Sequence, residues 1–112
     1  MAGPMRETGT VEPEVAEPDR RTRLQPRYHV VLLDDDDHTY AYVIEMLGRL
    51  FGYATERAYQ LAVEVDVTGR VIVETTTLER AEFKRDQIRA YGADPRLERS
   101  NCSMAAIVEP AE

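Results

Sequence analysis

The stretch YHVVLLDDDDHTYAYVIEMLGRLF, residues 28–51, contains the change of apolar period that decides the fold. Residues 28–33 end in the apolar run Val30-Val31-Leu32-Leu33, which is typical of a short strand. From Thr39 onward the apolar residues recur at the spacing of one helix face. Four consecutive aspartates, Asp34–Asp37, occupy the turn between these two elements. A structural turn needs only one or two such residues, so the run indicates carboxylates converging on a small cation or an amine.

Two further helices and two further strands are predicted downstream. Gly52 ends the first helix, and Thr55 is predicted to cap a second helix that ends at Gly69. A strand over residues 71–76 follows, and Thr77 is predicted to cap a third helix. The residues predicted to be buried on the second and third helices are Ala58, Leu61, Ala62, Val65, Leu78, Ala81 and Ile88.

Gly92 closes the third helix, and residues 104–108 offer a last short strand. The order is therefore β-α-α-β-α-β. At this size, the economical layout is an α+β domain with a three-stranded antiparallel sheet and three helices packed on one face.

The length of 112 residues allows one domain at most. Residues 1–26 carry four prolines and many charges but few large apolar side chains, so we expect a flexible N-terminal extension. The folded core is predicted over residues 27–109, and residues 110–112 form a short tail.

Acidic residues outnumber basic ones by 21 to 14, which gives a net charge of −7. This balance argues against nucleic acid and anionic membranes as partners, because both are negatively charged. A basic peptide or an amine fits the charge better. The chain has a single cysteine, Cys102, and no apolar stretch long enough to span a membrane. We therefore expect a cytoplasmic protein, and a monomer.

Two other interpretations of the aspartate run were weighed. In the first, Asp36 or Asp37 merely caps the helix that begins near Thr39. In the second, Asp34, Asp36 and Glu45 hold a divalent cation at EF-hand spacing, but Thr39 stands where that loop needs glycine. Weak Ca²⁺ or Mg²⁺ binding stays open as an alternative, although no dedicated metal site is expected.

Hydrolytic machinery is missing from the sequence. The only serines are Ser100 and Ser103, neither of which stands in a nucleophile elbow, and there is no glycine-rich phosphate loop. Cys102 has no evident base partner, and His38 is interpreted as a polar loop residue. We therefore expect a binding protein without a cofactor.

Several motifs together resemble the ClpS family of Clp protease adaptors. The likeness runs without a gap from Tyr28 to Lys84 and more loosely to about Glu109. It is carried by the strand with the acidic run and by Glu56-Arg57-Ala58 with Gln60-Leu61 in the second helix. The further matching residues are Val43, Ile44, Gly69, Thr77, Glu79, Ala81, Glu82 and Lys84.

This resemblance implies an adaptor that binds the free α-amino group and the first side chain of N-degron substrates. Such an adaptor delivers these substrates to the N-terminal domain of a Clp AAA+ unfoldase. The family's unfoldase-docking surface corresponds here to Glu79 and Lys84. Its amino-group site corresponds to Asp34, Asp35 and Asp66, and its side-chain pocket to Asp36, Tyr40, Ala62, Val65 and Met104.

The chain departs from the family pattern at six positions. Asp34 stands where the family usually has Asn, and Asp66 where it has His. The Thr-Pro-Met after the acids becomes His38-Thr39-Tyr40, and the pocket Met of the second helix becomes Ala62. Carboxylates accept hydrogen bonds from an ammonium more strongly than neutral groups do, so these changes favour amine recognition. They also predict an altered side-chain preference.

Three functions therefore stay under consideration. The first is an adaptor for amine-terminated substrates. The second is a modulator that docks on the unfoldase while its amine pocket has diverged. The third, from another class, is a small acidic domain that binds divalent cations.

Overall fold

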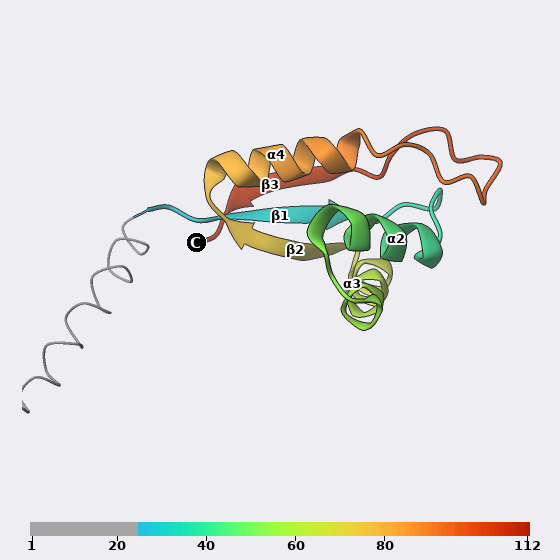
Figure 1. Cartoon of the computed structure of the whole chain (residues 1–112), viewed down its shortest axis with the longest axis horizontal. Helices are drawn as coiled ribbons and strands as arrows, with labels where there is room; N and C mark the ends of the chain where they lie inside the picture. The colour runs from blue at the N-terminus through green and yellow to red at the C-terminus, as the bar shows by residue number, and fades with distance from the viewer. Residues whose placement is uncertain (1–24) are drawn as a thin grey trace, which may run out of the picture.

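A computed structural model describes residues 25–112, which form six elements in the order β-α-α-β-α-β (Figure 1). The predicted extension over residues 1–26 falls almost wholly outside the described residues. The strands are β1 (Tyr28–Leu33), β2 (Arg70–Thr76) and β3 (Ala106–Pro110). The helices are α2 (Tyr40–Phe51), α3 (Thr55–Thr68) and α4 (Leu78–Arg89).

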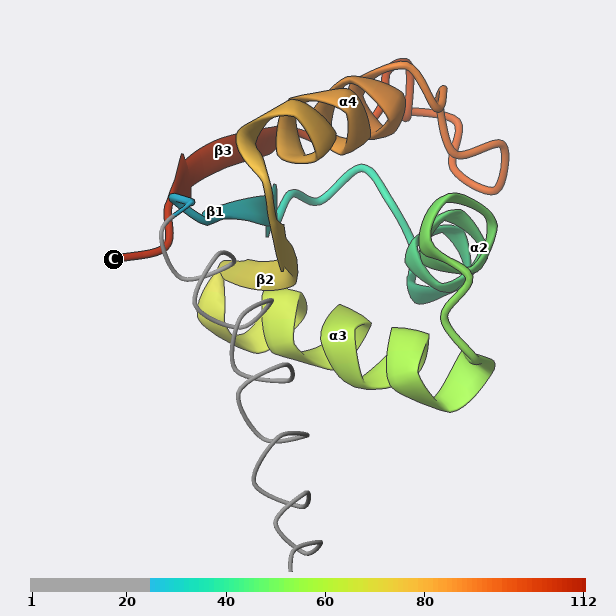
Figure 2. The same cartoon turned by 60° about the vertical axis from the view of Figure 1, so that its left-hand side comes forward.

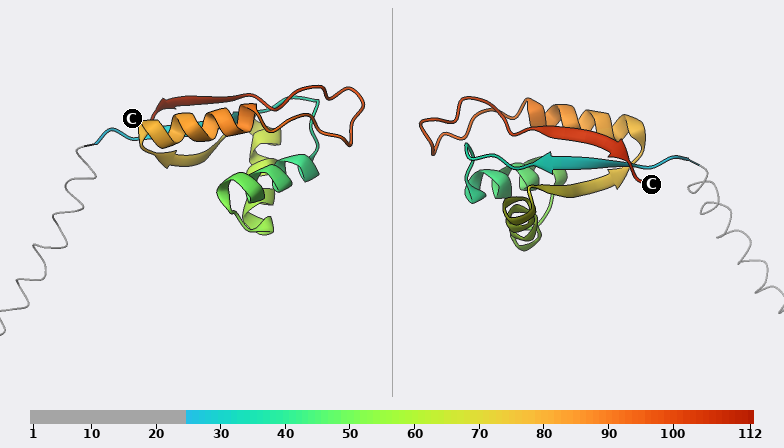
Figure 3. Two further views of the ribbon diagram at one scale, coloured as in Figure 1. Left: turned by 45° about the horizontal axis from the view of Figure 1, so that its top comes forward. Right: turned by 180° about the vertical axis from the view of Figure 1, so that it is seen from behind.

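The sheet has the order β2-β1-β3, and β1 pairs antiparallel with both neighbours. All the helices of residues 25–112 lie on one face of it, as the views in Figures 2 and 3 show. Helix α4 lies over β1 and β3, α3 contacts β2, and α2 packs on α3 beyond the end of the sheet. The predicted fold class is confirmed.

The core forms where the helical stripes meet the inner face of β1. Val30 and Leu32 point into it from the strand, and both are fully buried. Helix α2 contributes Tyr42, Met46 and Leu47, which are also buried. The predicted stripe of α3 is confirmed, since Ala58, Leu61, Ala62 and Val65 all belong to the core. β1 and the three helices therefore fix the position of the turn that joins β1 to α2.

The helix caps agree only in part with the sequence predictions. Thr77 caps α4 by accepting a hydrogen bond from the Arg80 amide, as expected. The N-cap of α3 is Ala54, because Thr55 is already helical, so the prediction for Thr55 was wrong by one residue. Thr39 caps α2 with its own side chain, 3.1 Å from the Tyr42 amide. The alternative in which Asp36 or Asp37 caps this helix is therefore wrong.

The ends of the fold differ from the sequence predictions at two places. Strand β3 begins at Ala106 rather than at residue 104 and continues through Pro110, where the Ala111 amide still bonds to the Arg27 carbonyl. Leu78 was predicted to be buried but is 41% exposed, because it is the first residue of α4. Among the described residues, no helix is long and apolar enough to cross a membrane.

Candidate functional site

The acidic turn, residues 34–39, begins at the end of the central strand β1. Backbone hydrogen bonds join its start to the residues that precede both neighbouring strands. The Leu33 amide donates to the Ala105 carbonyl at 3.0 Å, and the Asp34 amide donates to the Gly69 carbonyl at 3.0 Å. Asp34 therefore starts from a fixed backbone position beside the end of α3. The residues that follow Asp34 in the turn contact a segment that is distant in the sequence.

The distant segment is the clamp loop, residues 90–105, which joins α4 to β3. Its Asp94 is fully buried, and one carboxylate oxygen accepts both the Thr39 amide at 2.7 Å and the Thr39 hydroxyl at 2.8 Å. The other oxygen accepts the Arg96 amide at 3.0 Å. Burial alone would raise the pKa of Asp94, but the hydrogen bonds from Arg96 and Thr39 outweigh it and lower the pKa to about 2.

His38 makes a second tie between the turn and the clamp loop. Its Nδ1 lies 2.8 Å from an Asp35 carboxylate oxygen, and its Nε2 lies 2.7 Å from the Cys102 carbonyl oxygen. Both partners are acceptors, so only the imidazolium form donates at both nitrogens. The ring also packs on Tyr42, with ring centroids 4.5 Å apart. His38 is therefore a structural bridge that orients Asp35, a role that the sequence interpretation of a loop histidine missed.

Arg99 makes the third contact between the clamp loop and the turn, and it binds the last two aspartates of the run. Its guanidinium donates to the Asp36 carbonyl at 3.0 Å and lies 3.3 Å from the Asp37 carboxylate. Asp37 also donates its amide to Asp35 at 2.9 Å. Asp36 and Asp37 thus contact the clamp loop, whereas Asp34 and Asp35 border a cavity.

This cavity, of about 40 Å³, lies between the acidic turn and α3. It brings together seven of the eight residues predicted for the amine site and the side-chain pocket. The exception is Asp36, which does not line it and whose side chain is exposed because the turn carries it outward. The lining residues are Asp34, Asp35, His38, Thr39, Tyr40, Val43, Ala62, Val65, Asp66 and Met104.

Opposite walls of the cavity are joined by a hydrogen bond between two helices. The Tyr40 hydroxyl, from the first residue of α2, donates to an Asp66 carboxylate oxygen of α3 at 2.6 Å. This bond is the main reason that the pKa of Tyr40 rises to about 12. Burial raises the pKa of Asp34, and the nearby Asp66 carboxylate raises it further. The site thus gathers negative charge around a small space, which suits a cationic group with several donors.

Within residues 25–112, no group of three or more acidic, histidine or cysteine side chains is placed to hold a metal ion. The EF-hand spacing also fails in three dimensions, because Glu45 lies on α2 and pairs with Arg49 and Arg96, both at 3.0 Å.

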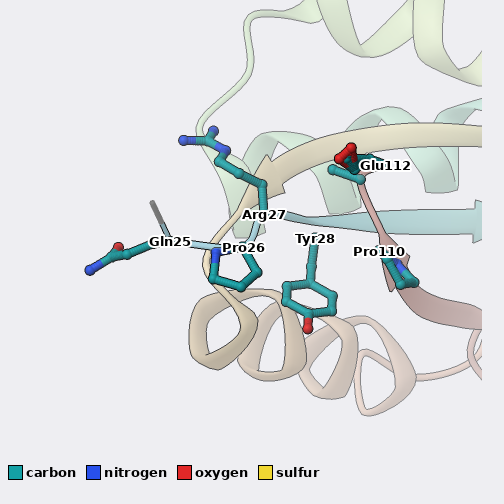
Figure 4. Close-up of a pocket in the computed structure, with 7 residues that line it drawn as sticks. Gln25, Pro26, Arg27, Tyr28, Pro110 and Glu112 are labelled. Carbon is teal, nitrogen blue, oxygen red and sulfur yellow. The ribbon is translucent and has the colours of Figure 1, made fainter. Parts of the chain in front are cut away.

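Two larger hollows lie at the opposite end of β1, around its first residue Tyr28. One, of about 360 Å³, is bordered by residues 25–28 and 110–112; Figure 4 shows Tyr28 and Pro26 on one side of the chain and Arg27 on the other. The second, of about 390 Å³, adds Thr77, Leu78 and Glu79. These hollows are separated from the acidic turn by the length of β1.

The two residues predicted for docking have different environments. Glu79 is exposed in the first turn of α4 and borders the second hollow. Lys84 is only 8% exposed, its ammonium donates to the Leu50 carbonyl, and burial lowers its pKa. Glu79 is therefore accessible to a partner, whereas Lys84 joins α4 to the end of α2.

The family model of the ATP-dependent Clp protease adaptor protein ClpS matches residues 23–96. The chain belongs to the ClpS family. The ClpS of Salmonella arizonae is 35% identical over 83 residues, which cover 72% of this chain and 78% of the relative. The ClpS of Vibrio cholerae is 40% identical over 76 residues, which cover 66% and 72%.

A solved structure of this family shares the fold of the chain. It is that of Agrobacterium tumefaciens ClpS2 bound to L-phenylalaninamide, with a TM-score of 0.62 at 20% sequence identity. The alignment covers 76% of this chain and 96% of that protein. The predicted resemblance to ClpS is confirmed.

We predict that the Asp94 clamp contributes to stability in a pH-dependent way. An aspartate whose folded pKa lies below its unfolded value stabilises the protein above the unfolded pKa, and this contribution is lost as pH falls through the folded pKa. A shift from 3.8 to about 2 corresponds to about 2 kcal/mol. Asp94→Asn should lower the free energy of unfolding by about that amount at pH 7, as urea titration would measure, and by progressively less between pH 4 and pH 2.

The matched control is Asp86→Asn, which removes an exposed carboxylate of α4. An equal loss of stability in both variants, or a loss for Asp94→Asn that does not shrink at low pH, would contradict the role assigned to the clamp.

We also predict that Tyr40 stays protonated at pH 10.5, because its hydroxyl donates to Asp66. In Asp66→Asn the acceptor is neutral, and the pKa of Tyr40 should return toward about 10. The ring Cζ chemical shift of Tyr40 in an NMR pH titration reports its ionisation. Equal ionisation in both proteins at pH 10.5 would show that the bond does not form in solution.

Proposed function

We propose that this ClpS-family chain is an adaptor that binds the free α-amino group and first side chain of N-degron substrates and delivers them to a Clp AAA+ unfoldase. The observation that carries the proposal is the convergence of Asp34, Asp35 and Asp66 on one cavity that also has an apolar floor. That floor is formed by Val43, Ala62, Val65 and Met104.

The chemistry of an α-ammonium group matches this arrangement. The group carries a positive charge and three N–H donors, and a carboxylate offers about four acceptor positions. Asp66 can therefore accept the Tyr40 hydroxyl and an ammonium together, and Asp35 can keep His38 while it accepts another donor. The burial that raises the pKa of Asp34 is compensated when a cation binds, because the opposite charge favours the ionised carboxylate.

The structural relative supports the same chemistry. Its ligand, L-phenylalaninamide, is an amino acid amide with a free α-amino group, and so imitates the first residue of a peptide chain. An ammonium and a single side chain are also what the cavity of this chain could receive.

Delivery requires a second surface, which we place at the start of α4. Glu79 and the 41% exposed Leu78 border the hollow that also receives Gln25 and Pro26, where the N-terminal extension meets the core. A Clp unfoldase domain bound there would therefore lie beside residues 25–28 and away from the acidic turn. Substrate and unfoldase could then be bound at the same time.

Binding of labelled peptides with a free or an acetylated N-terminus tests the proposal. We expect binding only with the free amine, because acetylation removes the positive charge and two donors. Asp66→Ala should weaken this binding at least tenfold, as fluorescence anisotropy would measure. The matched control is Glu64→Ala, which removes an exposed carboxylate of the same helix outside the cavity.

The other outcomes separate the rival functions. Binding to the isolated unfoldase domain without any peptide binding would support the modulator. Stabilisation by Ca²⁺ with neither of those activities would support a cation-binding domain and overturn the proposal.

A further inference from the structure

The imidazole of His38 lies between two hydrogen-bond acceptors in a place that is nearly closed to solvent. Its side chain is only 1% exposed. Nδ1 lies 2.8 Å and 3.0 Å from the two carboxylate oxygens of Asp35, and Nε2 lies 2.7 Å from the Cys102 carbonyl oxygen. A carboxylate and a carbonyl offer only lone pairs, so each ring nitrogen needs a proton of its own to form its bond.

The neutral imidazole cannot make both bonds, because it carries a single proton. That proton stays at Nδ1, beside the charged Asp35, which is the stronger of the two acceptors. Nε2 then directs a lone pair at the Cys102 carbonyl oxygen, and the buried position gives water no room to supply the missing donor. A buried acceptor without a donor is costly, so Cys102 has to move away from the neutral ring.

The ionisable side chains that surround this ring favour its charged form. The carboxylates of the turn and of α3 that border the same cavity are those of Asp34, Asp35 and Asp66. The neighbours in α2 and in the clamp loop are the Tyr42 phenol and the Cys102 thiol, and neither group carries a positive charge in any state. The guanidinium of Arg99 contacts the turn at Asp36 and Asp37 instead.

The contact with Cys102 helps to fix where the second half of the clamp loop lies. Its neighbours Ser100 and Ser103 use their hydroxyls to accept two amides from the start of the loop, those of Asp94 at 2.8 Å and Gly92 at 2.5 Å. These bonds join residues 100–103 to the rest of the loop, and His38 joins them to the turn. Met104, which borders the cavity, follows directly.

We infer that His38 is a pH-dependent switch, which holds the clamp loop against the acidic turn while the ring is charged and releases Cys102 when the ring loses its proton. The stability that the switch contributes is present at low pH and is lost as pH rises through the ionisation of the ring. This sign is opposite to that of the Asp94 clamp. The inference concerns the fold around the cavity and is independent of the proposed function.

The chain contains one other histidine, which serves as an internal control. Nδ1 of His29 lies 2.8 Å from the Thr75 hydroxyl, which can donate as well as accept. Both protonation states of His29 can therefore keep this bond. Ionisation of His29 should leave the structure around it unchanged.

The test is an NMR titration of the full chain from pH 5 to pH 9, which follows both imidazoles and the exchange of backbone amides with water. The Asp94 amide, which donates to Ser100, reports the position of residues 100–103. Its protection, corrected for the intrinsic pH dependence of exchange, should fall about tenfold or more over the range in which His38 loses its proton.

Three variants complete the test. In His38→Gln the protection of the Asp94 amide should be low at pH 5 and should not change with pH. His29→Gln should behave as wild type. Cys102→Ser keeps the backbone carbonyl but removes the thiol, the other side chain near the switch that ionises close to this range, and should also behave as wild type.

Two results would overturn the inference in the wild-type chain or its variants: protection that stays constant while His38 loses its proton, and a pH dependence that persists in a folded His38→Gln variant. A pH dependence that disappears in Cys102→Ser would assign the change to the thiol and would overturn it as well. Circular dichroism melting shows whether each variant folds. If His38→Gln does not fold, the titrations of wild type and Cys102→Ser decide.

Discussion

The buried carboxylate of Asp94 is the contact on which the geometry of the acidic turn depends. Four consecutive aspartates repel one another, and the strand that precedes them cannot relieve that repulsion. Asp94 fixes Thr39 at the other end of the turn, so the backbone between β1 and α2 is held at both ends. A buried carboxylate that accepts several hydrogen bonds is stable in this place, whereas an unpaired one would be costly.

The clamp loop also supplies the positive and polar groups that the turn lacks. Arg99 contacts Asp36 and Asp37, and the Cys102 carbonyl holds His38 against Asp35. These contacts divide the aspartate run into two pairs with different surroundings. Asp36 and Asp37 are bound to the loop, and Asp34 and Asp35 stay directed to the cavity beside Asp66. The carboxylates of Asp34, Asp35 and Asp66 therefore border one cavity, and their negative charge favours a cation there.

Sequence reasoning predicted the elements better than the contacts between them. The change of period after Leu33 and the glycines after α2 and α3 predicted strand, helix and helix ends, because these features are local. The approach of Asp66 to Asp34 came from the family resemblance, since no period relates residues so far apart. Asp94 gave no comparable signal, because residues 90–105 form an irregular loop in which no repeat indicates burial. The contact of Thr39 with Asp94 was missed for the same reason, because the two residues lie 55 positions apart.

Two of the residues that differ from the family pattern, Tyr40 and Asp66, contact each other in the structure. They stand where the family resemblance implies a methionine and a histidine, and they bond to each other through the phenol and the carboxylate. Ala62 makes room on the opposite wall, yet the space left is about 40 Å³. Tyr40 and Asp66 are therefore coupled: the Asp66 carboxylate that borders the cavity also accepts the Tyr40 hydroxyl.

The central claim is that Asp34 and Asp66 together receive an α-ammonium group. The most direct measurement is a crystal structure of the chain with a peptide that has a free N-terminus. We expect the amino nitrogen within about 3 Å of a carboxylate oxygen of each aspartate, and the first side chain in the cavity. An amino nitrogen that contacts neither aspartate, or a peptide bound at another surface, would contradict the account.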